Sequence, residues 1–382
     1  MEVGLLRRAG DLFTVAALVG TAVENEYNLH RFDSEVGKWT LKTVRLETPR
    51  KPFPVMIPIN ALRVNDHVTT TVIALGGKAG TIGWVDLWSG ILLYDLFPVD
   101  SERAVLRHMQ LPLPMHAITS KRKLMELGCP ADCRGIASVV KDGKPCLKLA
   151  DLQILGDHLP HIDIETGTHC YVVENWAVTV WSNNKIGYSD CYKDWQEDFT
   201  VWASEIRISD TVRSELLTSG LLQRNPSHDG EGTVELALQN LVLSEPKPSL
   251  NGEEAVVYLI ARPKPFLPKA WSLAIDMNNK TLLGVAEFCT KKPSRYPGVT
   301  TSTISSYMNP PTLQVIISYT WMLKQQIPLC YLNQAASKDV MWMIFIFHIL
   351  FVVLHCDLVI LCCFKCTVSR NRIVIVLVTE KF

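Results

Sequence analysis

Residues 83–95 read Gly83-Trp84-Val85-Asp86-Leu87-Trp88-Ser89-Gly90-Ile91-Leu92-Leu93-Tyr94-Asp95, and this stretch decides the fold class. It alternates apolar and polar residues around aromatics, turns at Ser89-Gly90, continues as an apolar run and ends at an aspartate. The pattern is typical of two antiparallel strands joined by a tight turn. Variants of it occur at three other places along the chain, and none of them carries a catalytic constellation. The sequence therefore predicts architecture more sharply than chemistry.

The composition limits the classes of function. The chain has 382 residues, with 38 Lys plus Arg and 38 Asp plus Glu, so its formal net charge is zero. No global field draws the chain to nucleic acid, and no basic stripe alternates with aromatics, so we expect no nucleic-acid partner. The 11 cysteines lack the regular spacing of a disulfide framework. Cysteines without this spacing favour a reducing compartment, the cytoplasm or the nucleus.

Strand and turn patterns recur along most of the chain. Aspartate and glycine punctuate the expected hairpins, because aspartate can accept a bond from its own backbone at a turn and glycine tolerates positive φ. One helix is expected, at residues 209–222. The expected strands and connections lie at residues 13–16, 27–32, 39–46, 68–75, 83–95, 104–110, 135–140, 146–152, 176–181, 199–208, 234–242, 255–261, 271–275 and 281–288, with a Glu245-Pro246-Lys247-Pro248 connection.

Units of this size are too small to bury an apolar face alone, so they must stack on one another. The sequence predicts an all-β, propeller-like body of several small antiparallel sheets, followed by a C-terminal hydrophobic helix. A β-sandwich is the alternative. The expected organisation is an N-terminal segment at 1–12, an all-β domain at 13–309, a linker at 310–339, a candidate transmembrane helix at 340–364 and a tail at 365–382.

Several motifs in the correct order resemble one family. They are Leu29-His30-Arg31-Phe32-Asp33-Ser34, the stretch at 83–93, Leu111-Pro112-Leu113-Pro114, Val257-Tyr258-Leu259 and Trp271-Ser272-Leu273-Ala274-Ile275-Asp276. Together they resemble the plant family called domain of unknown function 1618, which is expanded in grasses, over about residues 13–309. The resemblance implies no agreed activity. The family's organisation is similar to the propeller-like regions associated with F-box proteins, which implies protein binding, although we expect no F-box before the first strand here.

Two stretches imitate ligand sites. Residues 76–81, Gly-Gly-Lys-Ala-Gly-Thr, lie between expected strands and do not lead into a helix, so we expect a hairpin turn and not a phosphate loop. His158, His161, Asp163, Glu165, His169 and Cys170 form the best metal-like cluster. Their spacing matches no helix face, and Pro160 with Gly167 indicates an irregular surface loop, so no metal is predicted.

The remaining candidates have structural interpretations. Cys129 and Cys133 lack a second pair of zinc ligands, so we expect two loop thiols. Asp33, Asp95 and Asp276 end strands and are expected to cap turns. The tryptophans are expected mainly in the core. The sequence therefore predicts no catalytic, cofactor-binding or metal-binding residue and no cofactor.

The C-terminal part changes in composition. Residues 340–356 are nearly all apolar, and after Asp357 the apolar run resumes to Phe364. A helix of this length just crosses a hydrocarbon layer of about 30 Å, which predicts a membrane anchor through Val340 to Phe364. Lys365, Arg370 and Arg372 leave its orientation open. An appended tail from an incorrect gene model explains the same shift in composition.

The leading hypothesis is a non-enzymatic protein-interaction module that is tethered to a membrane if the tail is an anchor. Rigid repeated sheets that present variable loops suit recognition of a protein partner. We expect no small-molecule ligand. The alternative hypothesis is an enzyme with a pocket near the His158 to His169 loop.

Overall fold

The computed structural model describes residues 2–8, 10–47, 67–98, 105–114, 129–141, 143–162, 169–186, 192–222, 225–226, 233–234, 238–251, 255–262, 269–289, 362–369 and 372–379. The chain divides into two compact units, Met1–Tyr319 and Thr320–Phe382. The C-terminal hairpin lies in the second unit, and the other described residues lie in the first.

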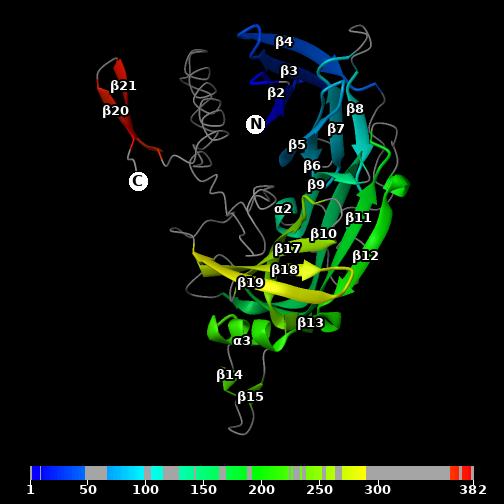
Figure 1. Ribbon diagram of the computed structural model, residues 1–382, viewed down its shortest axis with the longest axis vertical. Coiled ribbons are helices and arrows are strands. Elements are labelled where there is room, and N and C mark those ends of the chain that lie inside the picture. Colours follow the sequence, from blue (N-terminus) through cyan, green and yellow to red (C-terminus); the bar gives the residue numbers. More distant parts are fainter. Residues whose placement is uncertain are drawn as a thin grey trace. The chain divides into compact units, whose positions relative to one another are not determined.

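Four antiparallel sheets follow one another along the first unit (Figure 1). The first sheet contains β1 (Val3–Arg7), β2 (Phe13–Gly20), β3 (Glu26–Asp33) and β4 (Lys38–Arg45). The second contains β5 (Thr71–Gly76), β6 (Thr81–Asp86), β7 (Gly90–Asp95) and β8 (Arg107–Gln110). The third contains β9 (Arg134–Lys141), β10 (Lys144–Ile162), β11 (His169–Asn183) and β12 (Gln196–Trp202). In each of the three, neighbouring strands follow chain order.

The fourth sheet has the order β13-β19-β18-β17-β16. Its strands are β13 (Arg207–Ile208), β16 (Val242–Pro248), β17 (Val256–Arg262), β18 (Lys269–Asp276) and β19 (Thr281–Cys289), and β13 pairs with β19 in parallel. The short elements are α2 (Pro130–Cys133), η3 (Tyr192–Asp194), η4 (Ala203–Glu205), α3 (Asp210–Thr218), β14 (Asn225–Pro226), β15 (Thr233–Val234) and η5 (Leu238–Asn240). Ser209 caps α3 by accepting a bond from the Val212 N–H.

The quoted stretch forms the β6–β7 hairpin, as predicted. Asp86 ends β6, and its Oδ1 accepts bonds from the backbone N–H groups of Trp88 and Ser89 at 2.9 and 3.4 Å. Its Oδ2 accepts a third bond, from the Val68 N–H at 3.0 Å. The aspartate therefore closes the turn with its own carboxylate, which is why the chain reverses here.

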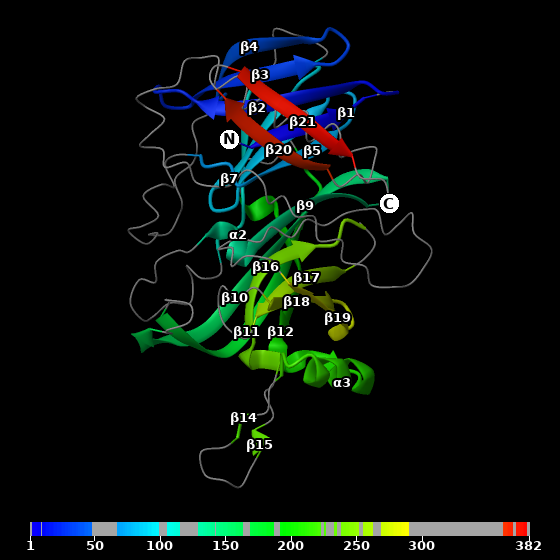
Figure 2. The ribbon, with the colours of Figure 1, turned by 90° about the vertical axis from the view of Figure 1, so that its left-hand side faces the viewer.

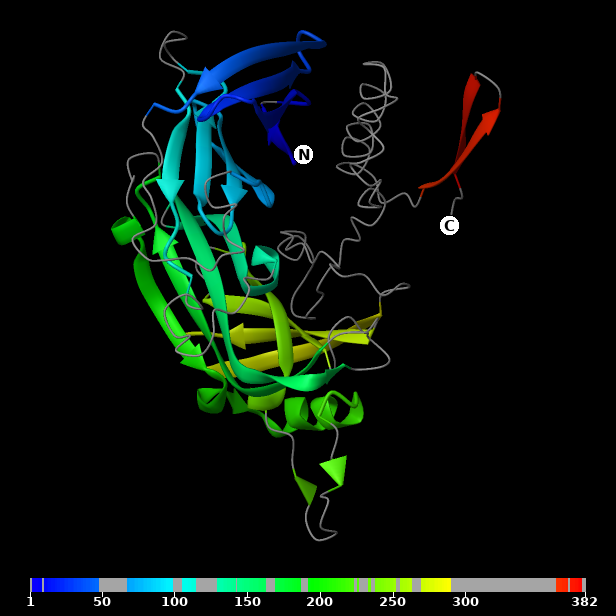
Figure 3. The same ribbon diagram turned by 180° about the vertical axis from the view of Figure 1, so that it is seen from behind.

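The sheets pack face to face in chain order. The alternation of β6 sends Ile82 and Trp84 toward the first sheet and Val85 toward the third. The alternation of β10 sends Leu149 toward the second sheet and Leu152 toward the fourth. The second and third sheets are therefore buried on both faces, and Figures 2 and 3 show the third sheet, in green, beside the yellow strands of the fourth.

The first unit is thus all-β with several small antiparallel sheets, as predicted. The two-sheet sandwich does not describe it, because the four larger described sheets form a series, beside the two-stranded β14–β15 sheet. Edge strands of successive sheets also touch: β1 contacts β5, β5 contacts β9 and β9 contacts β16. Propeller blades are expected to meet in this way. Closure into a ring is not seen in the described part of the chain, so the propeller stays a prediction.

Some predicted boundaries were wrong. β1 lies within the segment 1–12, where no strand was expected, and it pairs with β2 to complete the first sheet. β10 and β11 extend the third sheet to Ile162 and back from His169, where an irregular loop was predicted. Residues 238–240 form a 3₁₀ turn inside the strand expected at 234–242. The expected connection at Glu245–Pro248 belongs to β16.

The C-terminal unit contains one described hairpin, β20 (Cys362–Ser369) paired with β21 (Arg372–Thr379). Most of the predicted membrane helix, residues 340–361, lies outside the described residues, and its last three residues belong to β20. Among the described helices, none has the length and apolarity needed to cross a membrane. The predicted linker at 310–339 also lies outside the described residues.

Candidate binding cavity between the third and fourth sheets

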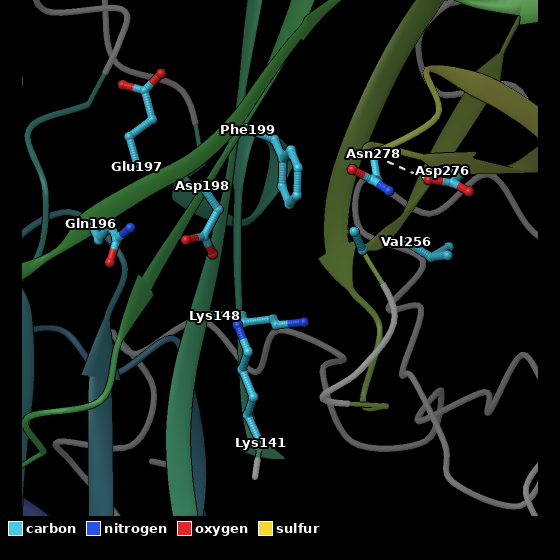
Figure 4. A pocket seen from close by; sticks show the side chains of 10 residues that line it. Lys141, Lys148, Gln196, Glu197, Asp198, Phe199, Val256, Asp276 and Asn278 are labelled. Atoms are coloured by element: carbon cyan, nitrogen blue, oxygen red, sulfur yellow. Dashed lines mark hydrogen bonds between the residues drawn. The ribbon is translucent and has the colours of Figure 1, made fainter.

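A cavity of about 580 Å³ lies between the third and fourth sheets (Figure 4). Its size falls within the range of about 300 to 1,000 Å³ that is usual for ligand sites. Three separate stretches of the third sheet and two of the fourth provide the walls. The described residues that line the cavity are Lys141, Lys148, Gln196, Glu197, Asp198, Phe199, Ala255, Val256, Asp276 and Asn278.

Two lysines come from the β9–β10 hairpin. Lys141 ends β9 and is exposed, whereas Lys148 lies on the face of β10 that also carries Ala150 and Leu152 toward the fourth sheet. The exposed fraction of Lys148 is only 8%. A lysine at this depth places a positive charge where water screens it little, which strengthens its attraction for an anionic group.

A β-bulge in β12 shapes the same wall. Val180 of β11 pairs with Phe199, and the next residue of β11, Trp181, pairs with Glu197. Asp198 is therefore the extra residue, and a bulge of this kind redirects side chains on the bulged strand. Figure 4 shows the carboxylate of Asp198 and the ring of Phe199 on neighbouring parts of the cavity wall. Ser182 holds Asp198 by donating from Oγ to Oδ1 at 2.9 Å.

The fourth sheet supplies an apolar strip and a polar turn. Ala255 and Val256, at the start of β17, are half-buried, and the turn after β18 brings Asp276 and Asn278 to the rim. Burial opposes ionisation of Asp276, but N–H donors of Asn279 and Asn278 outweigh burial and hold the pKa of Asp276 below its ordinary value. Asp276 is consequently a fixed negative charge at neutral pH.

The cavity therefore combines both signs of charge with an apolar centre. Two ammonium groups and three carboxylates, one of them on Glu197, surround the ring of Phe199 and the side chains of Ala255 and Val256. The described lining residues include no histidine, cysteine or serine. The lining offers ionic contacts of both signs and apolar contacts to a dipolar, partly apolar group.

A second polar cluster lies where α2, β16 and β17 meet. It contains Asp132, Glu245, Lys247 and Arg262, of which Glu245 and Arg262 are buried. Burial raises the pKa of Asp132 to about 6, although Arg262 acts in the opposite direction. Burial also lowers the pKa of Lys247, with Glu245 opposing it. These perturbed groups compensate one another in charge and sit against a strand contact, so we interpret the cluster as structural.

The glycine-rich residues 76–81, which resemble a phosphate loop, form a turn. β5 ends at Gly76, and Gly76, Gly77 and Gly80 have positive φ between β5 and β6. The hairpin prediction is confirmed. The metal-like cluster is not tested in the same way, because Asp163 and Glu165 lie outside the described residues and the side chains of His158, His161, His169 and Cys170 are not described. Among the side chains that are described, no group of three or more could hold a metal ion.

Cys133 lies on a short helix and not in a loop as predicted, whereas Cys129 lies outside regular structure, and neither forms a disulfide. Cys129 precedes α2 and Cys133 ends it. Burial, followed by the charge of Asp151, raises the pKa of Cys133 well above its ordinary value. Because the thiolate is the reactive form, this cysteine is poorly suited to nucleophilic chemistry at neutral pH.

Of the three strand-ending aspartates, two cap turns as predicted. Asp33 accepts from the Glu35 N–H at 3.1 Å, and Asp276 accepts from the N–H groups of Asn278 and Asn279 at 2.9 Å. Asp95 caps no turn among the residues that the structure describes. It accepts from the Thr81 hydroxyl at 2.6 Å and from Arg107 at 2.9 Å, and so ties β7 to both neighbouring strands.

Residues 84–258 match the model of a family described as "Protein of unknown function (DUF1618)". The match begins in β6, ends in β17 and includes every lining residue of the cavity except Asp276 and Asn278. Over these residues it confirms the family that the sequence motifs resemble. No curated protein matches the chain.

Proposed function

We propose that the chain is a non-enzymatic protein-interaction module. The proposal starts from the match of residues 84–258 to the DUF1618 family of proteins of unknown function and from the cavity that this segment mostly lines. The ligand of the module is an extended segment of a partner protein that carries an acidic and a basic side chain on either side of an apolar one. The observation that carries the proposal is the mixed lining of the cavity between the third and fourth sheets.

The distribution of groups supports this ligand. An acidic side chain of the partner meets Lys141 and Lys148, a basic one meets Glu197 and Asp198, and an apolar one packs on Phe199 with Val256. A lining with both lysines and carboxylates discriminates against purely acidic and purely basic segments. A purely acidic segment would be repelled by the carboxylates of the cavity, and a purely basic one by its lysines. The charged side chains of the lining make the cavity too polar for a wholly apolar ligand.

A peptide array tests the proposal directly. The purified full-length chain is applied to fifteen-residue synthetic peptides in four matched groups: mixed charge with a central aliphatic residue, all acidic, all basic and uncharged. We expect retention on the mixed-charge group and at least a tenfold loss of that binding for Asp198→Ala and for Phe199→Ala.

Glu215→Ala is the matched control, because Glu215 is an exposed carboxylate on α3, away from the cavity lining. It should bind as the unmodified chain does. Equal retention on all four peptide groups, or binding that survives both cavity substitutions, contradicts the proposed function.

A membrane tether is a second proposal, carried by the apolar residues 340–364. It adds location to recognition, with the all-β body in the cytoplasm or nucleus. The full chain should resist alkaline carbonate extraction from membranes. A chain with both Ile346→Asp and Val352→Asp should be released, because each charge near the bilayer centre costs about 2.5 to 3.5 kcal/mol on insertion scales. Identical partitioning of the two chains removes the tether from the account.

A further inference from the structure

The outer strand of the first sheet presents an unusual surface for a sheet edge. Within its bounds β4 pairs only with β3 among the described residues, and the parallel bridge of Leu46 to Leu106 begins one residue after β4 ends. No described strand lies beside the outer edge of β4 between Lys38 and Arg45. Leu41 of β4 has an exposed fraction of 63%, and Val36, in the turn before it, one of 65%. An exposed edge with apolar side chains is a site where another extended chain can add.

An aromatic row extends the apolar face behind that edge. Trp39 of β4 lies opposite Phe32 of β3, with ring centroids 5.3 Å apart, and Phe13 of β2 follows at 6.0 Å from Phe32. All three rings are half-buried. Aromatic side chains at a partly exposed position are enriched in the energetic centres of protein interfaces. The row therefore supplies a surface against which side chains of an added strand can pack.

The other face of β4 is basic from Lys38 to Lys42, whereas Val44 on that face is buried in the core. Because successive side chains alternate, Trp39 and Leu41 share one face while Lys38 and Lys42 share the opposite one. Both lysines are exposed, and neither forms an ion pair with a described residue. Lysines on an edge strand oppose pairing with a second copy of the same strand, since like charges would meet. The same two charges attract a strand of opposite sign.

We propose that β4 is a second docking site, and that its occupant is an extended acidic segment of a partner protein that pairs with β4 as an additional strand. The segment alternates acidic with apolar residues, so that its carboxylates meet Lys38 and Lys42 while its apolar side chains pack beside Trp39 and Leu41. This site lies on the first sheet, outside the family-matched residues and apart from the cavity.

Fluorescence anisotropy with a labelled peptide, acetyl-(Glu-Val)₄-amide, tests the proposal on the full-length chain. We expect saturable binding by this peptide. Two peptides of matched length should fail: (Lys-Val)₄, which reverses the charge, and Glu₄Val₄, which keeps the composition and breaks the alternation. The variant with Lys38→Glu and Lys42→Glu should bind at least tenfold more weakly.

A second charge-reversal pair controls for net charge. Lys78 in the β5–β6 turn and Lys193 in η3 are exposed lysines, and reversing both should leave the affinity unchanged. The Asp198→Ala variant of the cavity should also bind normally, which separates this site from the proposed function. The proposal is overturned by equal binding of the three peptides, by an equal effect of the two reversal pairs, or by self-association of the chain that the Lys38 and Lys42 reversals abolish.

Discussion

Arg134 shows how one residue holds two sheets together. Its side chain has an exposed fraction of 0%, and its guanidinium donates to the Leu87 and Pro112 carbonyl oxygens at 2.8 and 2.7 Å. Its Nε lies 3.2 Å from Oδ2 of Asp151, the residue opposite it on β10. The second and third sheets therefore share one charge-assisted network. This network could not be predicted from the sequence, because its partners are far apart along the chain.

Replacing Arg134 should destabilise the fold strongly. Arg134→Met keeps an apolar side chain of similar length but leaves Asp151 as a buried charge without its arginine. Breaking a buried pair in this way costs about 3 to 5 kcal/mol. Urea unfolding followed by tryptophan fluorescence measures the loss. Arg45→Met, at a pair whose arginine is 74% exposed, should cost less than about 1 kcal/mol, and similar losses for both would refute this role of Arg134.

Asp132 should make stability depend on pH in an uncommon direction. Its pKa in the folded chain is about 6, above the model-compound value of 3.8, because burial opposes its charge. The folded state thus binds this proton more tightly than the unfolded state does. The contribution is favourable at low pH and is lost as pH rises from about 4 to about 6, by roughly 1 to 3 kcal/mol.

Asp132→Asn removes that loss. The variant and the unmodified chain should unfold at similar urea concentrations at pH 4, and the variant should be the more stable at pH 7. Asp11→Asn, at an exposed loop carboxylate, should show no such divergence. A constant difference between Asp132→Asn and the unmodified chain across this pH range would contradict the assigned cause.

At the scale of elements, the hairpins could be predicted and the long strands could not. Hairpins closed by Asp33, Asp86 and Asp276 depend on contacts within a few residues, so sequence alone identifies them. β16 was missed because Pro246 and Pro248 imitate a connection. These prolines are tolerated because β16 is an edge strand, where an absent N–H breaks no ladder, and because Glu245, at φ 54°, forms a bulge.

The contact of β9 with β16 requires a glycine. A methyl group at Gly135 would overlap the backbone carbonyl oxygen of Pro246, which cannot move without its strand. Gly135→Ala should therefore separate the third and fourth sheets locally and cost about 3 kcal/mol, near the upper end for overpacking. Thermal unfolding of both variants measures the loss. Gly20→Ala should change stability little, because a methyl group at Gly20 would meet nothing within 4 Å and the φ of Gly20 is not positive. Equal midpoints for the two variants would exclude a tight contact at Gly135.

At the scale of the whole first unit, the all-β class and the repeated small sheets followed from the pattern of alternation. The cavity did not, because its lysines, bulged strand and apolar strip come from stretches separated by about fifty residues or more, and each stretch alone reads as an ordinary strand end. Only the packing of the third sheet on the fourth brings them together. The described series of sheets thus creates a site that no single motif encodes.

Hydrogen–deuterium exchange of the full-length chain, with and without the mixed-charge peptide that it retains best, tests the central claim most directly. The account predicts slower exchange in the bound state at residues 196–199, 255–258 and 276–278, with the Asp198→Ala variant losing this protection. Protection confined to other residues, or none at a saturating peptide concentration, would contradict a binding site between the third and fourth sheets.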